Sequence, residues 1–255
     1  SEMCIRDRRQ PGGSVRRMLP TPDVGHLRRP EYRDVVYDPA EDTFALIDAL
    51  EADADALCAA HATLCVEIGA GSGCVSAFVS TLLGHGVACV CTDISEVALR
   101  CTAETGTRNG VRSPVKLSCA DLQSVLSGVC CSTVDALRPR AEGAVDVLLF
   151  NPPYVVTPAE EEAELQAHAG LGSAWAGGPK GTALVDALLQ QRVFPRMLSP
   201  GGRLYLVAIR QNDPEGIVQA LVAQGLDAEV RPCMGLVTLT YRWFYGAART
   251  ASSCT

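Results

Sequence analysis

The apolar residues of this chain gather into short runs that alternate with helical repeats from about Pro39 onward. The runs at Leu64–Ile68, 87–94, 115–120 and Val145–Phe150 have the length and apolar content of strands buried in a parallel sheet. Alternation of such strands with helices is typical of one layered α/β domain. Apolar residues recur every three or four positions, which predicts helices, at 40–60, 74–83, 95–105, 182–198 and 214–224.

The end of the chain breaks the alternation. An apolar strand at 203–209 and the helix that follows it are succeeded by two strand-like stretches, 227–232 and 236–244. No helical pattern separates these two stretches, so they predict an antiparallel hairpin. We therefore expect an α/β, Rossmann-like fold: a seven-stranded, mostly parallel sheet with helices on both faces and a C-terminal antiparallel hairpin.

The two ends of the chain differ from this pattern. Residues 1–33 have no apolar period and carry an arginine cluster with Pro11 nearby, so we expect a disordered tail. Residues 34–246 are expected to form a single domain, and 247–255 a flexible C-terminal tail. The irregular stretch at 123–144 is interpreted as an insertion or loop.

Charge and cysteine usage exclude several classes of protein. The formal net charge is −7, which disfavours tight binding to bare nucleic acid. No apolar run reaches the roughly 20 residues of a membrane span. The 12 cysteines include no C-x-x-C pair, so we expect no metal site. We expect reduced, mostly buried thiols instead, in a cytoplasmic protein for which the nucleus is a second expected location.

A glycine-rich turn follows the first predicted strand, in the sequence Glu67-Ile-Gly69-Ala-Gly71-Ser-Gly73. Glycines at such a turn let the backbone approach a ligand closely. The spacing departs from the G-x-G-x-x-G of dinucleotide enzymes, and an acid directly before the turn would repel a pyrophosphate. A carboxylate suits a sulfonium cation and its amino-acid group, which favours S-adenosyl-L-methionine over a nicotinamide dinucleotide.

Acidic residues also follow the next two strands. Asp93 ends the second strand, where doubly wound folds hold ribose hydroxyls with a carboxylate. Asp121 follows the third strand and could accept a hydrogen bond from the adenine amine, while Leu122 packs on the ring. Either acid alone could equally be a helix cap or a solvated turn. Together with the glycine turn, they predict a cofactor site at the carboxyl edge of the sheet.

The sequence Asn151-Pro152-Pro153-Tyr154 follows the buried strand Val145–Phe150 directly. Two prolines restrict the backbone and hold the asparagine side chain at the edge of the sheet. The Asn151 oxygen and the Pro152 carbonyl can together accept both hydrogens of a planar –NH₂ group, and Tyr154 can pack on its plane. This geometry aims the nitrogen at a methyl donor. The competing interpretation is a simple turn that ends a strand.

These motifs resemble the class I amino-methyltransferases, which modify glutamine amides or the exocyclic amines of adenine and guanine. The motif Val36-Tyr37-Asp38-Pro39-Ala40-Glu41-Asp42-Thr43-Phe44 is similar to the eukaryotic HemK-like branch, the release factor glutamine methyltransferases. Cys91–Ile94, 150–158 and 174–178 match that branch as well. The resemblance covers roughly residues 34–244. Asp38 stands where the family usually has a glutamate.

The resemblance implies a protein methyltransferase that modifies the glutamine of the Gly-Gly-Gln loop of the eukaryotic class-1 release factor, with histone lysine open as a second acceptor. It also implies a heterodimer with a small zinc-binding activator protein along the open sheet edge around residues 115–119. A nucleic-acid amine methyltransferase is the alternative, which would need a basic groove or a recognition domain. The implied catalytic residues are Asn151, Pro152 and Tyr154, and the implied cofactor-binding residues are Thr43, Glu67, Gly69, Gly71, Asp93, Ile94, Asp121, Leu122 and Asn151.

Overall fold

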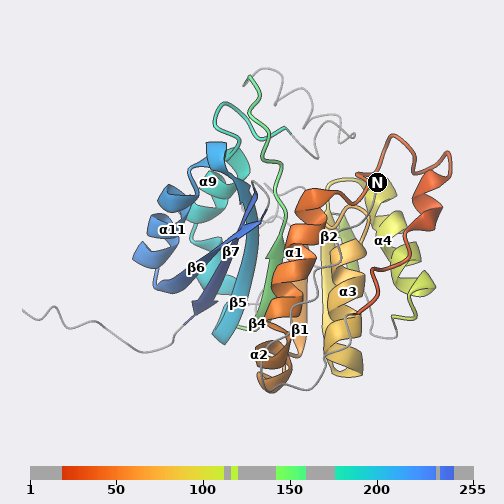
Figure 1. The fold of residues 1–255 in the computed structure, drawn as a ribbon, viewed down its shortest axis with the longest axis horizontal. Helices are drawn as coiled ribbons and strands as arrows, with labels where there is room; N and C mark the ends of the chain where they lie inside the picture. Colours follow the sequence, from red (N-terminus) through yellow and green to blue (C-terminus); the bar gives the residue numbers. More distant parts are fainter. Residues whose placement is uncertain (1–18, 112–115, 120–141, 159–175, 234–235, 244–255) are drawn as a thin grey trace, which may run out of the picture.

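The computed structural model describes residues 19–111, 116–119, 142–158, 176–233 and 236–243. These residues form a seven-stranded sheet in the order β3-β2-β1-β4-β5-β7-β6 (Figure 1). The mostly parallel sheet and the C-terminal hairpin agree with the sequence, which does not predict this order. The first five strands pair in parallel, and β7 runs antiparallel between β5 and β6. The strands are β1 (Leu64–Ile68), β2 (Ala88–Asp93), β3 (Lys116–Cys119), β4 (Val145–Phe150), β5 (Leu198–Ile209), β6 (Leu226–Cys233) and β7 (Leu236–Trp243).

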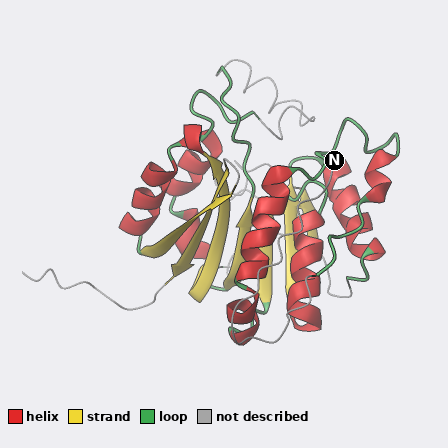
Figure 2. Ribbon diagram, viewed as in Figure 1, coloured by secondary structure: helices red, strands yellow, loops and turns green. Residues whose placement is uncertain are grey.

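Helices cover both faces of the sheet (Figure 2). Those before β3 pack on one face with their neighbouring strands, and those after β4 pack on the other. The helices and turns are η1 (Gly25–Arg28), α1 (Glu41–Ala52), α2 (Ala54–Ala59), α3 (Cys74–Leu83), η2 (Gly84–Gly86), α4 (Glu96–Arg108), α9 (Ala183–Gln190), α10 (Val193–Met197), η4 (Arg210–Asn212) and α11 (Pro214–Ala223). The short 3-10 turns lie before α1, after α3 and before α11.

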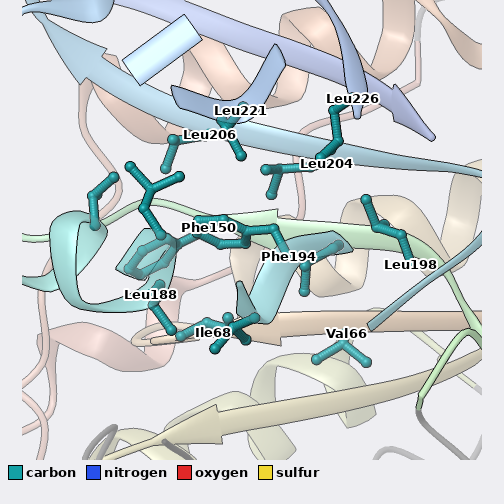
Figure 3. Packing of buried hydrophobic residues seen from close by; sticks show 14 of the residues in the cluster. Val66, Ile68, Phe150, Leu188, Phe194, Leu198, Leu204, Leu206, Leu221 and Leu226 are labelled. Atoms are coloured by element: carbon teal, nitrogen blue, oxygen red, sulfur yellow. The ribbon is translucent and has the colours of Figure 1, made fainter. Parts of the chain in front are cut away.

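The central strand β4 explains why the core has two halves. Its Leu148 and Phe150 side chains join the cluster under α9, α10 and α11, whereas Val147 and Leu149 join the cluster under α1 and α3. Successive side chains of a strand point to opposite faces, so an apolar run fills both halves. Figure 3 shows Phe150 and Phe194 at the centre of the first cluster, with their ring centroids 6.4 Å apart.

Two predicted helices are interrupted. The helix expected at 40–60 divides at Asp53, whose carboxylate accepts hydrogen bonds from Arg203 (2.7 Å) and Tyr205 (2.9 Å) on β5. The helix expected at 182–198 divides at Arg192, which adopts a left-handed φ of 53°. Pro195 explains this break, because it lacks an N–H and its ring clashes with the carbonyl four residues earlier.

The N-terminal segment differs from the expectation of a tail that reaches residue 33. Residues 19–33 pack along α4: Leu27 and Tyr32 are buried against Ala98 and Cys101. His26 lies edge-on to Tyr32 with ring centroids 5.5 Å apart. A few buried side chains anchor this segment without any helical period, which is why its sequence pattern is uninformative.

Other expectations fall outside the described residues. These include most of the irregular stretch at 123–144. Among the described residues, no helix has the length and apolar character needed to cross a membrane.

Candidate active site

The glycine turn between β1 and α3 forms the floor of a cavity at the carboxyl edge of the sheet. Gly69 and Gly71 have φ values of 68° and 52°, in the left-handed region that favours glycine. Gly73 is the N-cap residue directly before α3, and a Cβ on this residue would lie 2.7 Å from Thr102 Cα. Helix α4 therefore packs directly against the turn. The turn exposes its backbone to the cavity and leaves no room for side chains at its end.

Two acids that the sequence singles out stand on either side of this turn. Asp93 accepts hydrogen bonds from the backbone N–H groups of Gly71 and Ser95, both at 2.9 Å. Burial raises the pKa of Asp93, and these bonds partly oppose that shift. Each carboxylate oxygen can accept a further hydrogen bond, so Asp93 can still bind hydroxyl groups in the cavity.

Glu67 is the more deeply buried acid, with 4% of its surface exposed. Burial raises its pKa to about 8, although Ser76 donates hydrogen bonds to Glu67 Oε2 from its backbone and its hydroxyl. A cation placed beside Glu67 would favour the ionised carboxylate. The buried Glu67 carboxylate therefore fits a positively charged ligand group better than a phosphate.

The other end of the cavity is organised around Asp42, which is 3% exposed and stands in the first turn of α1. Its Oδ2 accepts hydrogen bonds from Asn151 Nδ2 and from the Tyr154 hydroxyl, both at 3.0 Å. Its Oδ1 accepts from the Thr43 backbone N–H at 2.7 Å and from the Tyr37 hydroxyl at 3.3 Å. Both oxygens of Asp42 are thus already used within the protein.

This arrangement fixes the orientation of the Asn151 amide. A carboxylate can only accept hydrogen bonds, so the –NH₂ group of Asn151 must face Asp42. The other atom of the amide, Asn151 Oδ1, is buried and has no hydrogen-bond partner among the described residues. A buried unpaired acceptor is costly, and such groups are concentrated where a ligand completes them. Asn151 therefore presents a free acceptor at the cavity.

Tyr154 acts in this site as a donor rather than as a base. Burial and the Asp42 carboxylate raise its pKa well above the usual range of a phenol. Its hydroxyl keeps its proton at neutral pH and donates a hydrogen bond to Asp42. The Tyr37 hydroxyl is affected in the same way, because burial and Asp42 raise its pKa as well.

The structure brings most of the predicted site residues together. Asn151 lines the cavity beside Pro153, but Pro152 and Tyr154 are not among its lining residues. Asp121 and Leu122 lie outside the described residues. The predicted cofactor residues that line the cavity are Thr43, Glu67, Gly69, Gly71, Asp93, Ile94 and Asn151.

Sequence reasoning missed Asp42 as a site residue. It lies within the motif that runs from Val36 to Phe44. An acid in the first turn of a helix is ordinarily interpreted as a partner for the helix dipole. Only its burial in the folded structure sets it apart, since a charged residue in that place is usually solvated. Other cavity residues that were not predicted include Tyr37, Ser72 and Leu184.

No protein-family model matches the chain. The mouse protein named methyltransferase HEMK2 is 43% identical over 215 residues, which are 84% of this chain and 90% of the mouse protein. The catalytic subunit mtq2 of the eRF1 methyltransferase of Schizosaccharomyces pombe is 39% identical over 213 residues, 82% of this chain and 87% of the yeast protein.

A solved structure shares the fold. The E. cuniculi Mtq2–Trm112 complex, described as responsible for methylation of the eRF1 translation termination factor, matches with a TM-score of 0.53 and 23% identity. The match covers 82% of this chain and 98% of the other.

Proposed function

Because the chain belongs to the family of the HEMK2 and Mtq2 methyltransferases, we propose that it methylates a glutamine side-chain amide in the release factor eRF1. The acceptor is the glutamine of the Gly-Gly-Gln loop. The observation that carries this proposal is the buried, unpaired Asn151 Oδ1, held in one orientation by Asp42. A free acceptor beside a restricted backbone carbonyl matches the two N–H groups of a primary amide.

The cofactor proposed for the cavity is S-adenosyl-L-methionine, which supplies a methyl group on a positively charged sulfur. Asp93 would accept hydrogen bonds from the ribose hydroxyls, and Glu67 would balance the positive charge near the glycine turn. Thr43 and Ile94 would complete the contacts within the cavity. Asp121 and Leu122 remain the proposed adenine contacts.

Asn151 Oδ1 and the Pro152 carbonyl would hold the substrate –NH₂ group by its two hydrogens. An amide nitrogen is a poor nucleophile because its lone pair is delocalised into the carbonyl. Fixing both hydrogens orients the nitrogen face toward the methyl group and stabilises the positive charge that builds there. Asn151 and the Pro152 carbonyl would hold the nitrogen in line with the methyl group that the bound cofactor would supply, and the methylated nitrogen would then lose one amide proton.

No residue at this end is proposed as a strong base. Asp42 already accepts hydrogen bonds on both oxygens, and the Tyr154 hydroxyl is held protonated. The proton is therefore lost to solvent after methyl transfer, when the nitrogen is acidic. Asp42 is a positioning residue in this mechanism: it sets the Asn151 amide so that its oxygen, not its –NH₂, meets the substrate.

We further propose that a small zinc-binding activator pairs with this chain along β3. The solved relative is a complex of Mtq2 with Trm112, which supports a partner of this kind. Strand β3 stands at the end of the sheet order and pairs with β2 on one side. A strand in that place offers backbone N–H and C=O groups to a second chain.

Mass spectrometry on purified components tests the proposed function. The full chain, co-expressed with the activator, is incubated with S-adenosyl-L-methionine and eRF1, and the peptide that contains the Gly-Gly-Gln loop is analysed. We expect one added methyl group on the loop glutamine. Parallel reactions contain a mixture of histones and mixed-sequence DNA and RNA oligonucleotides. Methyl transfer to an oligonucleotide base without transfer to eRF1 would overturn the proposal in favour of the nucleic-acid alternative.

A further inference from the structure

Asn212 lies at the end of η4, beyond β5, and is 3% exposed. Its Nδ2 lies 3.0 Å from the Tyr154 carbonyl, 3.2 Å from that of Lys180 and 3.3 Å from that of Gly181. Its Oδ1 accepts a hydrogen bond from the Ile209 backbone N–H at 2.9 Å. Donor and acceptor partners on opposite sides fix the orientation of this amide. One buried side chain thus joins three separate backbone segments.

The segment 176–181 runs beside the chain that follows Tyr154. Val155 and Ala176 form an isolated parallel bridge, and the Gly177 N–H donates to the Val155 carbonyl at 2.8 Å. The Thr157 N–H donates to the Gly178 carbonyl at 2.9 Å. These hydrogen bonds hold the backbone after Tyr154 against a second loop, which we call the glycine strap (residues 176–181).

The glycine strap lies too close to the reactive motif for any side chain on its facing residues. A Cβ on Gly181 would lie 2.2 Å from the Tyr154 carbonyl oxygen and 2.4 Å from Asn212 Nδ2. A Cβ on Gly177 would lie 2.6 Å from the Pro153 carbonyl oxygen. The backbone from Pro153 to Thr157 is therefore packed directly against the strap, and Asn212 closes the contact at its other end.

We infer that Asn212 is a positioning residue for methyl transfer, which acts through the backbone of Pro152–Tyr154. This inference rests on the proposed function, in which the Pro152 carbonyl and Asn151 Oδ1 hold the substrate amide. Asp42 fixes the side chains of Asn151 and Tyr154, whereas Asn212 fixes the backbone that carries them. Small displacements of such a backbone reduce the rate of the chemical step more than they reduce cofactor binding.

The test compares Asn212→Ala with Gln224→Ala in the full chain, purified with its activator. Gln224 is a matched control, because its Nε2 also donates to a backbone carbonyl, that of Leu189, at 2.9 Å, but far from the reactive motif. We expect Asn212→Ala to lower kcat for eRF1 methylation by roughly 10- to 100-fold. The Kd for S-adenosyl-L-methionine should stay within about twofold, because Asn212 does not line the cavity. Gln224→Ala should lower Tm with kcat unchanged.

Asn212→Asp separates positioning from loss of packing. At neutral pH its carboxylate would face three carbonyl oxygens, so kcat should fall below that of Asn212→Ala. Protonation restores one donor, so the ratio of the kcat of Asn212→Asp to that of Asn212→Ala should rise as the pH falls. An unchanged kcat in Asn212→Ala, with only a lower Tm, would leave Asn212 a structural residue and overturn the inference.

The two proposals fail in different ways. If the unmodified chain does not methylate eRF1, the proposed function fails, whatever Asn212 does. Hydrogen exchange then tests the inference without a substrate. Asn212→Ala should speed exchange at the Gly177 and Thr157 amides and leave the amides of β1 unchanged. Unchanged hydrogen exchange at the Gly177 and Thr157 amides would overturn the inference about Asn212.

Discussion

The two ends of the cavity are built in different ways. At the cofactor end, each polar group stands at the end of its own strand: Glu67 in β1 and Asp93 in β2, with the glycine turn beside them. At the acceptor end, side chains from remote segments are joined by hydrogen bonds. Asp42 reaches Asn151 across 109 residues of sequence, and Asn212 reaches Tyr154 across 58.

This difference predicts different consequences of mutation. A residue at the cofactor end contacts the ligand directly, so its loss should weaken binding in proportion to the bonds removed. A residue at the acceptor end belongs to a network in which only Asn151 Oδ1 is left unpaired among the described residues. Loss of one member changes the orientation of the others, so the rate of transfer should fall more than any affinity.

The largest effect is expected for Asn151→Ala. The variant removes the unpaired Asn151 acceptor and leaves the Asp42 carboxylate without one of its donors. Methyl transfer to eRF1 should be abolished, while calorimetry should find S-adenosyl-L-methionine bound with nearly the original affinity. Asn109→Ala, at the end of α4, is a control that should keep full activity. Turnover at the original rate in Asn151→Ala would end the proposed mechanism.

A smaller loss is expected for Asp42→Asn. An asparagine at this position can present its own –NH₂ to Asn151 and satisfy Oδ1, the atom reserved for the substrate. We expect kcat to fall by about 100-fold or more, the range seen when a preorganised group is lost. Asp48→Asn, an exposed position on the same helix, should have no effect. Equal kcat values for the two variants would contradict the role of Asp42.

The cofactor end could be predicted from the sequence because its residues are local to strand ends. The bounds of β1 and β4 match the prediction, since each is a short apolar run that ends at a turn residue, Gly69 or Asn151. Ser95 caps α4 near the predicted start of this helix, with its hydroxyl oxygen accepting from the Ala98 N–H at 3.3 Å. The glycine turn and Asp93 follow directly from these elements.

The acceptor end could not be predicted in the same way. Nothing in the residues around Asp42 or Asn212 indicates which distant groups they contact. The motif Asn151–Tyr154 is recognisable, but the carboxylate that orients its amide depends on where α1 packs. The break at Asp53 has the same cause, because its partners Arg203 and Tyr205 lie on another element. Sequence patterns indicate periodicity and turns, whereas these contacts arise only from tertiary packing.

A moderate effect is expected for Asp93→Ala. The carboxylate is proposed to accept hydrogen bonds from the ribose, so its loss should weaken S-adenosyl-L-methionine binding by about 1–3 kcal/mol. At saturating cofactor, kcat should recover to near its original value, in contrast to Asp42→Asn. Titration calorimetry and initial rates measure the two quantities separately. An unchanged Kd would refute the ribose contact, and a kcat loss that saturation does not rescue would remove the distinction between the two ends.

The last prediction concerns the stability of the protein without cofactor, and it depends on pH. Burial raises the pKa of Glu67 from its ordinary 4.5 to about 8, so the folded chain keeps a proton that the unfolded chain has already released. The contribution of Glu67 to stability is therefore complete below about pH 4.5, declines as the pH rises, and levels off above about pH 8.

The side chain of the Glu67→Gln variant cannot titrate. The difference in Tm between the original chain and this variant should thus decrease from pH 5 to 8 and stay constant above it. Glu215→Gln, at an exposed position on α11, should show no such trend.

Saturating S-adenosyl-L-methionine should flatten the slope of this Tm difference against pH, because a positive charge beside Glu67 favours the carboxylate. A slope that the cofactor does not change would place the positive charge elsewhere, and the cofactor end would then lose the contact that its buried acid is proposed to make.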